Sequence, residues 1–230
     1  MDWTRTFDAY CERTDAAYWS EPVNAVTNLA FIVAAAVMWR RSGGLGPARY
    51  LSAVLGLIGV GSFLFHTHAT AWAATLDVVP IMVFALSYIY LANRDFLGWP
   101  VRAAALGTVA FLPFSAAVGA AVSGVPFLGV SAEYWALPLM IGVYGAGLAR
   151  RGRAVGRDLL VGAGILVVSL VFRSLDEPFC GAFPLGTHFL WHILNAVMLG
   201  WMIETWCREA RRGFTSASVR GKARSDFPKE

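Results

Sequence analysis

Apolar runs of about 20 residues, the length of a membrane-spanning helix, recur along almost the whole chain and limit its fold more than any other feature. The sequence is 57% hydrophobic and 15% charged, whereas a soluble domain carries about 25% charged residues. Only helices and closed barrels satisfy the backbone in lipid, and these runs are too long and continuous for barrel strands. The sequence therefore predicts one integral membrane domain made of helices.

The predicted membrane domain contains seven apolar segments. They cover residues 23–39, 50–67, 75–92, 102–122, 133–149, 158–173 and 187–206. Some are slightly short for a span, which helices in a bundle tolerate. We therefore expect an all-α membrane protein with a seven-transmembrane helix bundle over residues 23–206. A polar, aromatic-rich cap over residues 1–22 precedes it, and a basic, disordered tail over residues 207–230 follows it.

Positive charge is concentrated in every second loop of this predicted bundle. The basic residues after the first, third and fifth segments are Arg40, Arg41, Arg49, Arg94, Arg102, Arg150, Arg151, Arg153 and Arg157, and the tail is basic as well. The opposite side holds only Arg5, Arg13 and Arg173. The positive-inside rule then places the N-terminus outside and the C-terminus in the cytoplasm. The short loops and the Arg- and Ala-rich composition suggest a bacterial inner membrane, with the outer side facing the periplasm.

Three histidines fall at the predicted outer ends of the helices. His66 lies near the end of the second segment, and His188 and His192 open the seventh. The last two are four residues apart, so both imidazoles project from one helix face. Three histidines and a water form a tetrahedral zinc site with one open position. Because ionisable groups in membrane helices are costly and usually functional, a metal site is favoured over isolated polar tips at the headgroups.

Two more polar side chains fall at the same depth. Ser62 is four residues before His66 and shares its helix face, while Asp77 follows His66 by eleven residues, just past a short outer loop. Asp77 can contact the metal's water or orient an imidazole. The alternatives are close helix packing for Ser62 and a favourable helix-dipole contact for Asp77. His68 is more simply explained as a loop histidine than as a fourth site residue.

The N-terminal cap offers a second candidate site. Glu21, Asn24 and Asn28 share one face of a helix by their spacing. The carboxylates that precede them are Asp8, Glu12 and Asp15. Clustered oxygen ligands of this kind suit a hard cation such as calcium. The alternative, that Glu21 caps the helix and the asparagines join helices, is slightly favoured by spacing alone.

Two of the three cysteines, Cys11 and Cys180, fall on the predicted outer side, and Cys207 falls at the cytoplasmic end of the last segment. An oxidising outer compartment permits a disulfide between the first two. The spacing of the residues does not establish that their Cα atoms come close enough for one.

These stretches together resemble the alkaline ceramidase family, within a wider group of seven-helix membrane hydrolases that includes the adiponectin receptors. The resemblance rests on YCER at residues 10–13, EPVNAVTN at 21–28, GSFLFHTHAT at 61–70 with LD at 76–77, RSLDEPFC at 173–180 and HFLWHIL at 188–194. They follow the family's order and span nearly the whole chain. The serine before the histidine, the aspartate after it and the late HxxWH are specific in combination.

The resemblance implies zinc held by His66, His188 and His192, with Ser62 and Asp77 beside the metal-bound water. It implies hydrolysis of the amide bond of a ceramide-like lipid to a sphingoid base and a fatty acid, and it supports the Cys11–Cys180 disulfide. Eukaryotic members also resemble calcium binders at their N-terminal cap. Glu12 and Glu21 match that pattern, whereas Ala9 stands in the place of the family's aspartate and Asp8 is one position out of register.

Two other functions stay open on the sequence. The chain could be a zinc hydrolase of another lipid amide or ester. It could instead be a non-enzymatic seven-helix receptor or sensor, in which a fourth protein ligand such as His68 or Asp77 closes a structural metal site. In each case the expected partners are the bilayer and a membrane lipid rather than a nucleic acid.

Overall fold

The computed structural model describes the backbone of residues 2–225 and the side chains of residues 2–213, and every regular element in this part of the chain is a helix. The α-helices are α1 (Pro22–Thr27), α2 (Leu29–Arg41), α3 (Gly46–His68), α4 (Ala71–Leu91), α5 (Val101–Val122), α6 (Ala136–Arg150), α7 (Ala154–Phe179) and α8 (His188–Ser225). A short π-helix, η1 (Ala92–Phe96), extends α4, and a 3-10 turn, η2 (Gly129–Ser131), precedes α6. The all-helical prediction is confirmed.

Five helical segments are long and apolar enough to cross a membrane. They are Pro22–Arg41, Gly46–His68, Ala71–Phe96, Val101–Val122 and Ala154–Phe179. α6 is apolar but shorter, at 15 residues. α8 has 38 residues but carries His188, His192, Asn195 and Glu204 in its first half. The chain is thus a multi-pass membrane protein by the length and composition of its helices, while the count of seven spans stays a prediction.

The outward surface of the bundle is apolar, most clearly on α5. Only 6% of its most apolar stretch is buried inside the protein. Leu106 and Val109 on this helix are 71% and 61% exposed. A soluble protein rarely leaves a continuous apolar helix face uncovered, whereas a helix in lipid does so at no cost.

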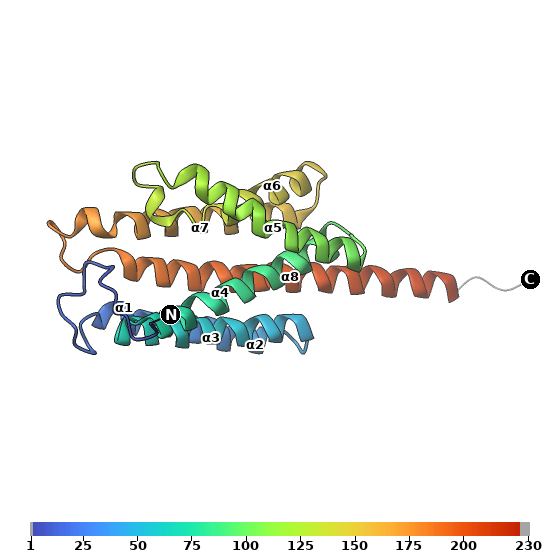
Figure 1. Ribbon diagram of the computed structural model, residues 1–230. Helices are drawn as coiled ribbons and strands as arrows, with labels where there is room; N and C mark the ends of the chain where they lie inside the picture. Colours follow the sequence, from blue (N-terminus) through green and yellow to red (C-terminus); the bar gives the residue numbers. More distant parts are fainter. Residues whose placement is uncertain (1, 226–230) are drawn as a thin grey trace, which may run out of the picture.

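The helices run along one common direction, and α4 crosses the bundle obliquely (Figure 1). α8 lies in the middle, with α2 and α3 on one side and α7, α6 and α5 on the other (Figure 1). α3 packs against α4, and α7 packs against both α6 and α8. The core between them is formed by fully buried aliphatic side chains such as Leu55 of α3, Leu170 of α7 and Ile203 of α8.

The two ends of the bundle differ in character. The N-terminal segment, the end of α7 and the start of α8 meet at one end, whereas the loops after α2, η1 and α6 lie at the other (Figure 1). At that second end Arg153 forms an ion pair with Glu209, and Arg211 donates a hydrogen bond to the backbone of Arg41. The arginine-rich loops therefore share one end of the molecule, opposite the start of α8.

The first predicted segment is not one continuous helix. α1 and α2 are separated at Asn28, whose backbone N–H bonds to Ala25 O at 3.3 Å instead of continuing the α-helical pattern. The Asn28 side chain donates to the Asn24 carbonyl at 2.8 Å. A side chain that takes a backbone acceptor in this way competes with the helix.

The predicted tail also differs from the structure. The α8 backbone stays helical from residue 207 to Ser225, where the sequence predicts disorder. Ion pairs one turn apart, Arg208 with Glu204 and Arg212 with Glu209, support the helix as far as Arg212. Residues 226–230 lie outside the described part of the chain, and the division into cap, membrane domain and tail stays a prediction.

Candidate metal centre

His66, His188 and His192 meet at the end of the bundle where α8 begins. Their candidate ligand nitrogens all lie within 4.8 Å of one another, and all three residues are buried. α3 supplies His66 from its last turn, and α8 supplies the other two from its first turns. Within the described residues this is the one group of three or more histidines, cysteines or carboxylates close enough to share a metal ion.

The hydrogen bonds of His192 decide which of its nitrogens faces the centre. Thr27 Oγ1 lies 3.0 Å from His192 Nδ1 and 2.7 Å from the Val23 carbonyl oxygen. The single hydroxyl proton is donated to a carbonyl, so Nδ1–H of His192 donates to Thr27. Nε2 is then the nitrogen with a free lone pair, and it is buried without a hydrogen-bond partner.

A buried carboxylate sets the tautomer of His66. Glu21 Oε2 lies 2.6 Å from His66 Nδ1, and Glu21 Oε1 accepts a 2.5 Å hydrogen bond from Arg13. Burial raises the pKa of Glu21, but the bonds from His66 and Arg13 outweigh it and hold the pKa below its usual value. An ionised carboxylate only accepts hydrogen bonds, so Nδ1–H of His66 donates and Nε2 keeps its lone pair.

The three imidazoles fit a zinc ion. His188 Nδ1, like His192 Nε2, is buried with no hydrogen-bond partner. The ring of Tyr10 stacks on the His188 ring with centroids 3.8 Å apart. A set of nitrogen donors backed by a carboxylate and a hydroxyl is the usual arrangement around zinc-binding histidines.

Ser62 and Asp77 lie beside the histidines. Together with His192 they line one cavity. Gly61 allows this proximity, because a Cβ there would lie 2.0 Å from the Leu76 carbonyl oxygen of α4. Asp77 Oδ1 is buried and makes no hydrogen bond. The centre thus has an uncommitted carboxylate oxygen next to it.

His68 lies apart from the three histidines. It is exposed, and its ring contacts Tyr18 and Trp72 at centroid distances of 5.1 Å and 4.9 Å. Neither His68 nor Asp77 belongs to the group that could share a metal. Within the described residues, no further histidine, cysteine or carboxylate joins His66, His188 and His192 in that group.

The carboxylates proposed for calcium are not gathered into a site. Asp8 and Asp15 are exposed, and Asp15 accepts a hydrogen bond from the backbone of Ala17. Glu12 accepts hydrogen bonds from the N–H groups of Val23 and Asn24, at 2.6 Å and 2.7 Å.

Glu12 therefore satisfies the orphan donors at the start of α1, the cap role that the sequence alternative gave to Glu21. Glu21 is engaged by Arg13 and His66 instead. The calcium prediction is thus unsupported, because the Arg13 guanidinium forms an ion pair with Glu21, and Glu12 accepts hydrogen bonds from backbone N–H groups.

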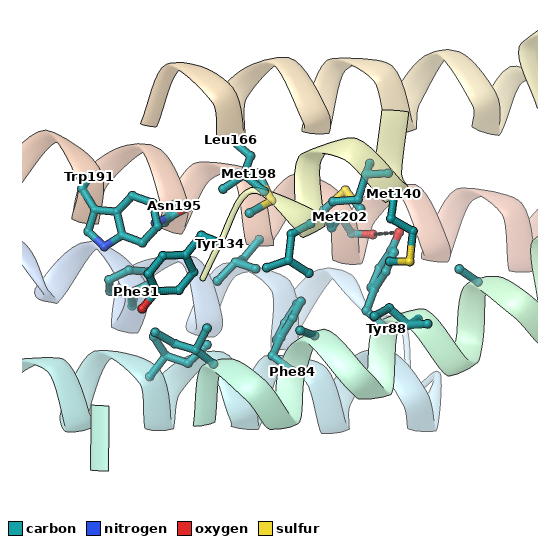
Figure 2. Close-up of a pocket in the computed structure, with 18 of the residues that line it drawn as sticks. Phe31, Phe84, Tyr88, Tyr134, Met140, Leu166, Trp191, Asn195, Met198 and Met202 are labelled. Carbon is teal, nitrogen blue, oxygen red and sulfur yellow. Dashed lines mark hydrogen bonds between the residues drawn. The ribbon is translucent and has the colours of Figure 1, made fainter. Parts of the chain in front are cut away.

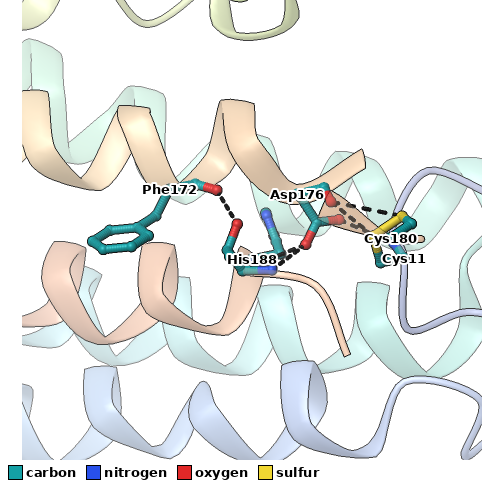
Figure 3. Close-up of a disulfide and its surroundings, with 6 residues drawn as sticks. Cys11, Phe172, Asp176, Cys180 and His188 are labelled. Atoms are coloured by element: carbon teal, nitrogen blue, oxygen red, sulfur yellow. Dashed lines mark hydrogen bonds between the residues drawn. A yellow bond between two sulfur atoms is a disulfide. The ribbon is translucent and has the colours of Figure 1, made fainter. Parts of the chain in front are cut away.

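Asp176 holds the start of α8 in place, and the sequence interpretation gave it no role. Its Oδ1 accepts hydrogen bonds from the backbone N–H groups of Thr187 and His188, at 2.7 Å and 2.8 Å, and its Oδ2 accepts one from Cys11. Cys11 and Cys180 form a disulfide beside it (Figure 3). A carboxylate at a helix N-terminus is favoured by the helix dipole. The disulfide and Asp176 together tie the N-terminal segment, α7 and α8 to one another.

Tyr134 is a second residue that the sequence interpretation missed. It comes from the loop between η2 and α6 and lines the cavity with Asp77 and His192. Arg173 fixes this loop by donating to Val130 O at 2.6 Å, and its guanidinium lies 5.1 Å from the Tyr134 ring centroid.

Comparison with known proteins agrees with this geometry. The profile of the ceramidase family matches residues 6–220, which include every residue of the centre. No curated protein matches the chain. The match covers nearly the whole chain, so the chain belongs to the ceramidase family.

Proposed function

We propose that this chain is a zinc-dependent intramembrane hydrolase that cleaves the amide bond of ceramide-like lipids to a sphingoid base and a fatty acid. One observation carries the proposal. Three buried histidines, two of them with a buried and unpartnered nitrogen, stand with Ser62 and Asp77 at the head of an apolar cavity. A polar reaction centre that opens into an apolar cavity suits a substrate with a polar linkage and a long hydrocarbon chain.

The protein side chains divide the work of hydrolysis between them. A bound zinc ion would supply a Lewis acid and a water ligand with a pKa of about 7. Asp77 Oδ1 takes the proton of the water that adds to the amide carbonyl carbon, and later donates it to the leaving nitrogen as the C–N bond breaks. The Ser62 hydroxyl donates a hydrogen bond to the developing oxyanion.

The remaining residues orient these groups. Glu21 and Thr27 hold the tautomers of His66 and His192, so that each keeps a lone pair on Nε2. Asp176 fixes the first turn of α8 and with it the position of His188. Groups that orient ligand histidines are worth about 10- to 100-fold in metal affinity.

The arginine-rich end of the bundle supports the proposed orientation in the membrane. In a bacterial inner membrane this end would face the cytoplasm, and the histidine centre would face the periplasm. The Cys11–Cys180 disulfide lies at the histidine end, as an oxidising compartment allows.

The geometry favours a hydrolase over a sensor with a structural metal. A structural zinc site is closed by four protein ligands. Here three histidines converge, while His68 and Asp77 lie outside the group that could share a metal. A fourth position is thus left for water or substrate.

The choice of substrate is tested by incubating the purified protein, in detergent with zinc, with a panel of lipids of equal acyl length. The panel contains an N-acyl sphingosine, an N-acyl ethanolamine and an acyl ester of glycerol, and mass spectrometry identifies the products. We expect free sphingosine and fatty acid from the first and slower or no release from the others. Preferred release from the ester or the ethanolamide would replace the ceramide with that lipid.

Arg13 gives a separate prediction about metals. Its guanidinium neutralises Glu21, so adding calcium to zinc-loaded, calcium-free protein should leave the hydrolysis rate unchanged. Arg13→Ala should lower zinc affinity by roughly 10- to 100-fold, because Glu21 loses the group that positions it against His66. Competition with a fluorescent zinc chelator measures the affinity, and Arg5→Ala is the matched control. Activation of the wild type by calcium would contradict the claim that Arg13, rather than calcium, neutralises Glu21.

A further inference from the structure

The cavity extends from the histidine centre far into the bundle. On α8 its lining follows one stripe, from His192 through Asn195 and Met198 to Met202. That stripe is about 15 Å long at 1.5 Å per residue. One leaflet of a bilayer, half of the hydrocarbon core of about 30 Å, has the same thickness. The cavity therefore accepts one hydrocarbon chain of a lipid along its length.

Asn195 places a polar amide side chain in this apolar lining. It is only 6% exposed, it faces the cavity and no described residue forms a hydrogen bond with its side chain. Polar groups deeper in the cavity do have hydrogen-bond partners. The Tyr88 hydroxyl donates to Met202 O, and the Tyr144 hydroxyl donates to Asn93 Oδ1. Figure 2 shows Asn195 near Trp191 and Tyr134, toward the left end of the cavity in that view, with Tyr88 toward the right end.

An unpaired amide in an apolar cavity has an energetic consequence. A buried polar group without a hydrogen-bond partner is energetically unfavourable, and a plain hydrocarbon chain beside Asn195 gives its amide no partner. A chain that carries a hydroxyl at this depth removes the cost, because the amide offers both a donor and an acceptor.

The position of Asn195 indicates which carbon would carry that hydroxyl. It follows His192 by three residues on the same helix face, which is about 4.5 Å along the axis. With the amide carbonyl at the histidines, this depth corresponds to the first carbons of the acyl chain. Carbon 2, next to the carbonyl, is among these carbons and is the nearest to the histidines that can bear a hydroxyl.

We infer that Asn195 is a specificity residue that recognises a 2-hydroxyl group on the acyl chain, so that 2-hydroxyacyl lipids are preferred substrates. The inference rests on the proposed function for the cleavage step, but the recognition itself concerns binding. The expected preference is roughly tenfold, the effect of one buried hydrogen bond whose partner would otherwise stay unpaired.

The test uses the zinc-loaded full-length protein and two kinds of measurement. The first is the affinity for 2-hydroxypalmitic acid against palmitic acid, measured by displacement of a fluorescent fatty acid. The second is hydrolysis of the matching N-acyl sphingosines in competition. The wild type should favour the hydroxylated ligand in both. Asn195→Leu should lose this preference and bind palmitic acid more tightly, while Val197→Leu, on the exposed face of α8, should keep the wild-type ratio.

The two measurements separate this inference from the proposed function. Equal binding of the two acids by the wild type, or an unchanged preference in Asn195→Leu, would overturn the role of Asn195. Preferred binding of the hydroxy acid that disappears in Asn195→Leu, without hydrolysis of either sphingosine derivative, would support Asn195 and refute the amidase. A zinc content equal to that of the wild type shows that each variant is folded at the centre.

Discussion

Replacing His192 with alanine should reduce ceramide hydrolysis to background and strip zinc from the purified protein. The change removes one of three nitrogens within 4.8 Å of one another, and two imidazoles do not complete the ligand set of a catalytic zinc site. The measurements are the zinc content by mass spectrometry and the release of sphingosine from an N-acyl sphingosine.

His68→Ala is the matched control for this experiment. It removes the same kind of side chain from the end of α3, but His68 is exposed and its ring contacts Tyr18 of the N-terminal segment and Trp72 of α4. Zinc content and turnover should stay at wild-type values. Normal turnover by a folded His192→Ala protein would exclude the metal mechanism, and loss of zinc in His68→Ala would place a fourth ligand at the centre.

Replacing Asp77 with asparagine should lower kcat by about 100- to 10,000-fold, the usual contribution of a positioned general base. The substitution keeps the size of the side chain, and Asp77 is not among the residues that could share the metal. Zinc content should therefore stay the same, and KM should change little, because the lost step is proton transfer rather than substrate binding.

Asp8→Asn is a suitable comparison, since Asp8 is an exposed carboxylate of the N-terminal segment. It should behave as the wild type in both kcat and zinc content. If Asp77→Asn instead lost zinc together with its activity, Asp77 would be a metal ligand rather than the general base. If it kept full activity, the proton acceptor would have to be another group.

The parts of the centre that depend on local spacing could be predicted from the sequence. His188 and His192 are four residues apart on one helix, so their shared direction follows from helix geometry. His66, Ser62 and Asp77 needed only the order of the apolar segments, which puts the ends of neighbouring helices at the same depth. The helices themselves followed from the length of the apolar runs, apart from the break at Asn28 and the continuation of α8 to Ser225.

The groups that orient the histidines could not be predicted in the same way. Thr27 and His192 are 165 residues apart, and Glu21 and His66 are 45 apart. No periodicity links such pairs, because they meet only when α1, α3 and α8 pack together. The spacing of Glu21 to Asn24 and Asn28 leaves a calcium site and a helix cap as alternatives, and nothing in that spacing reveals Arg13 as the partner of Glu21.

The central claim is that amide hydrolysis requires a zinc ion bound by the three histidines. Metal analysis alongside the ceramide assay tests this claim most directly. Purified wild-type protein should contain one zinc ion per chain. A strong chelator should remove the zinc and the hydrolysis in parallel, and added zinc should restore both. Full hydrolysis by protein shown to be free of zinc would contradict the account.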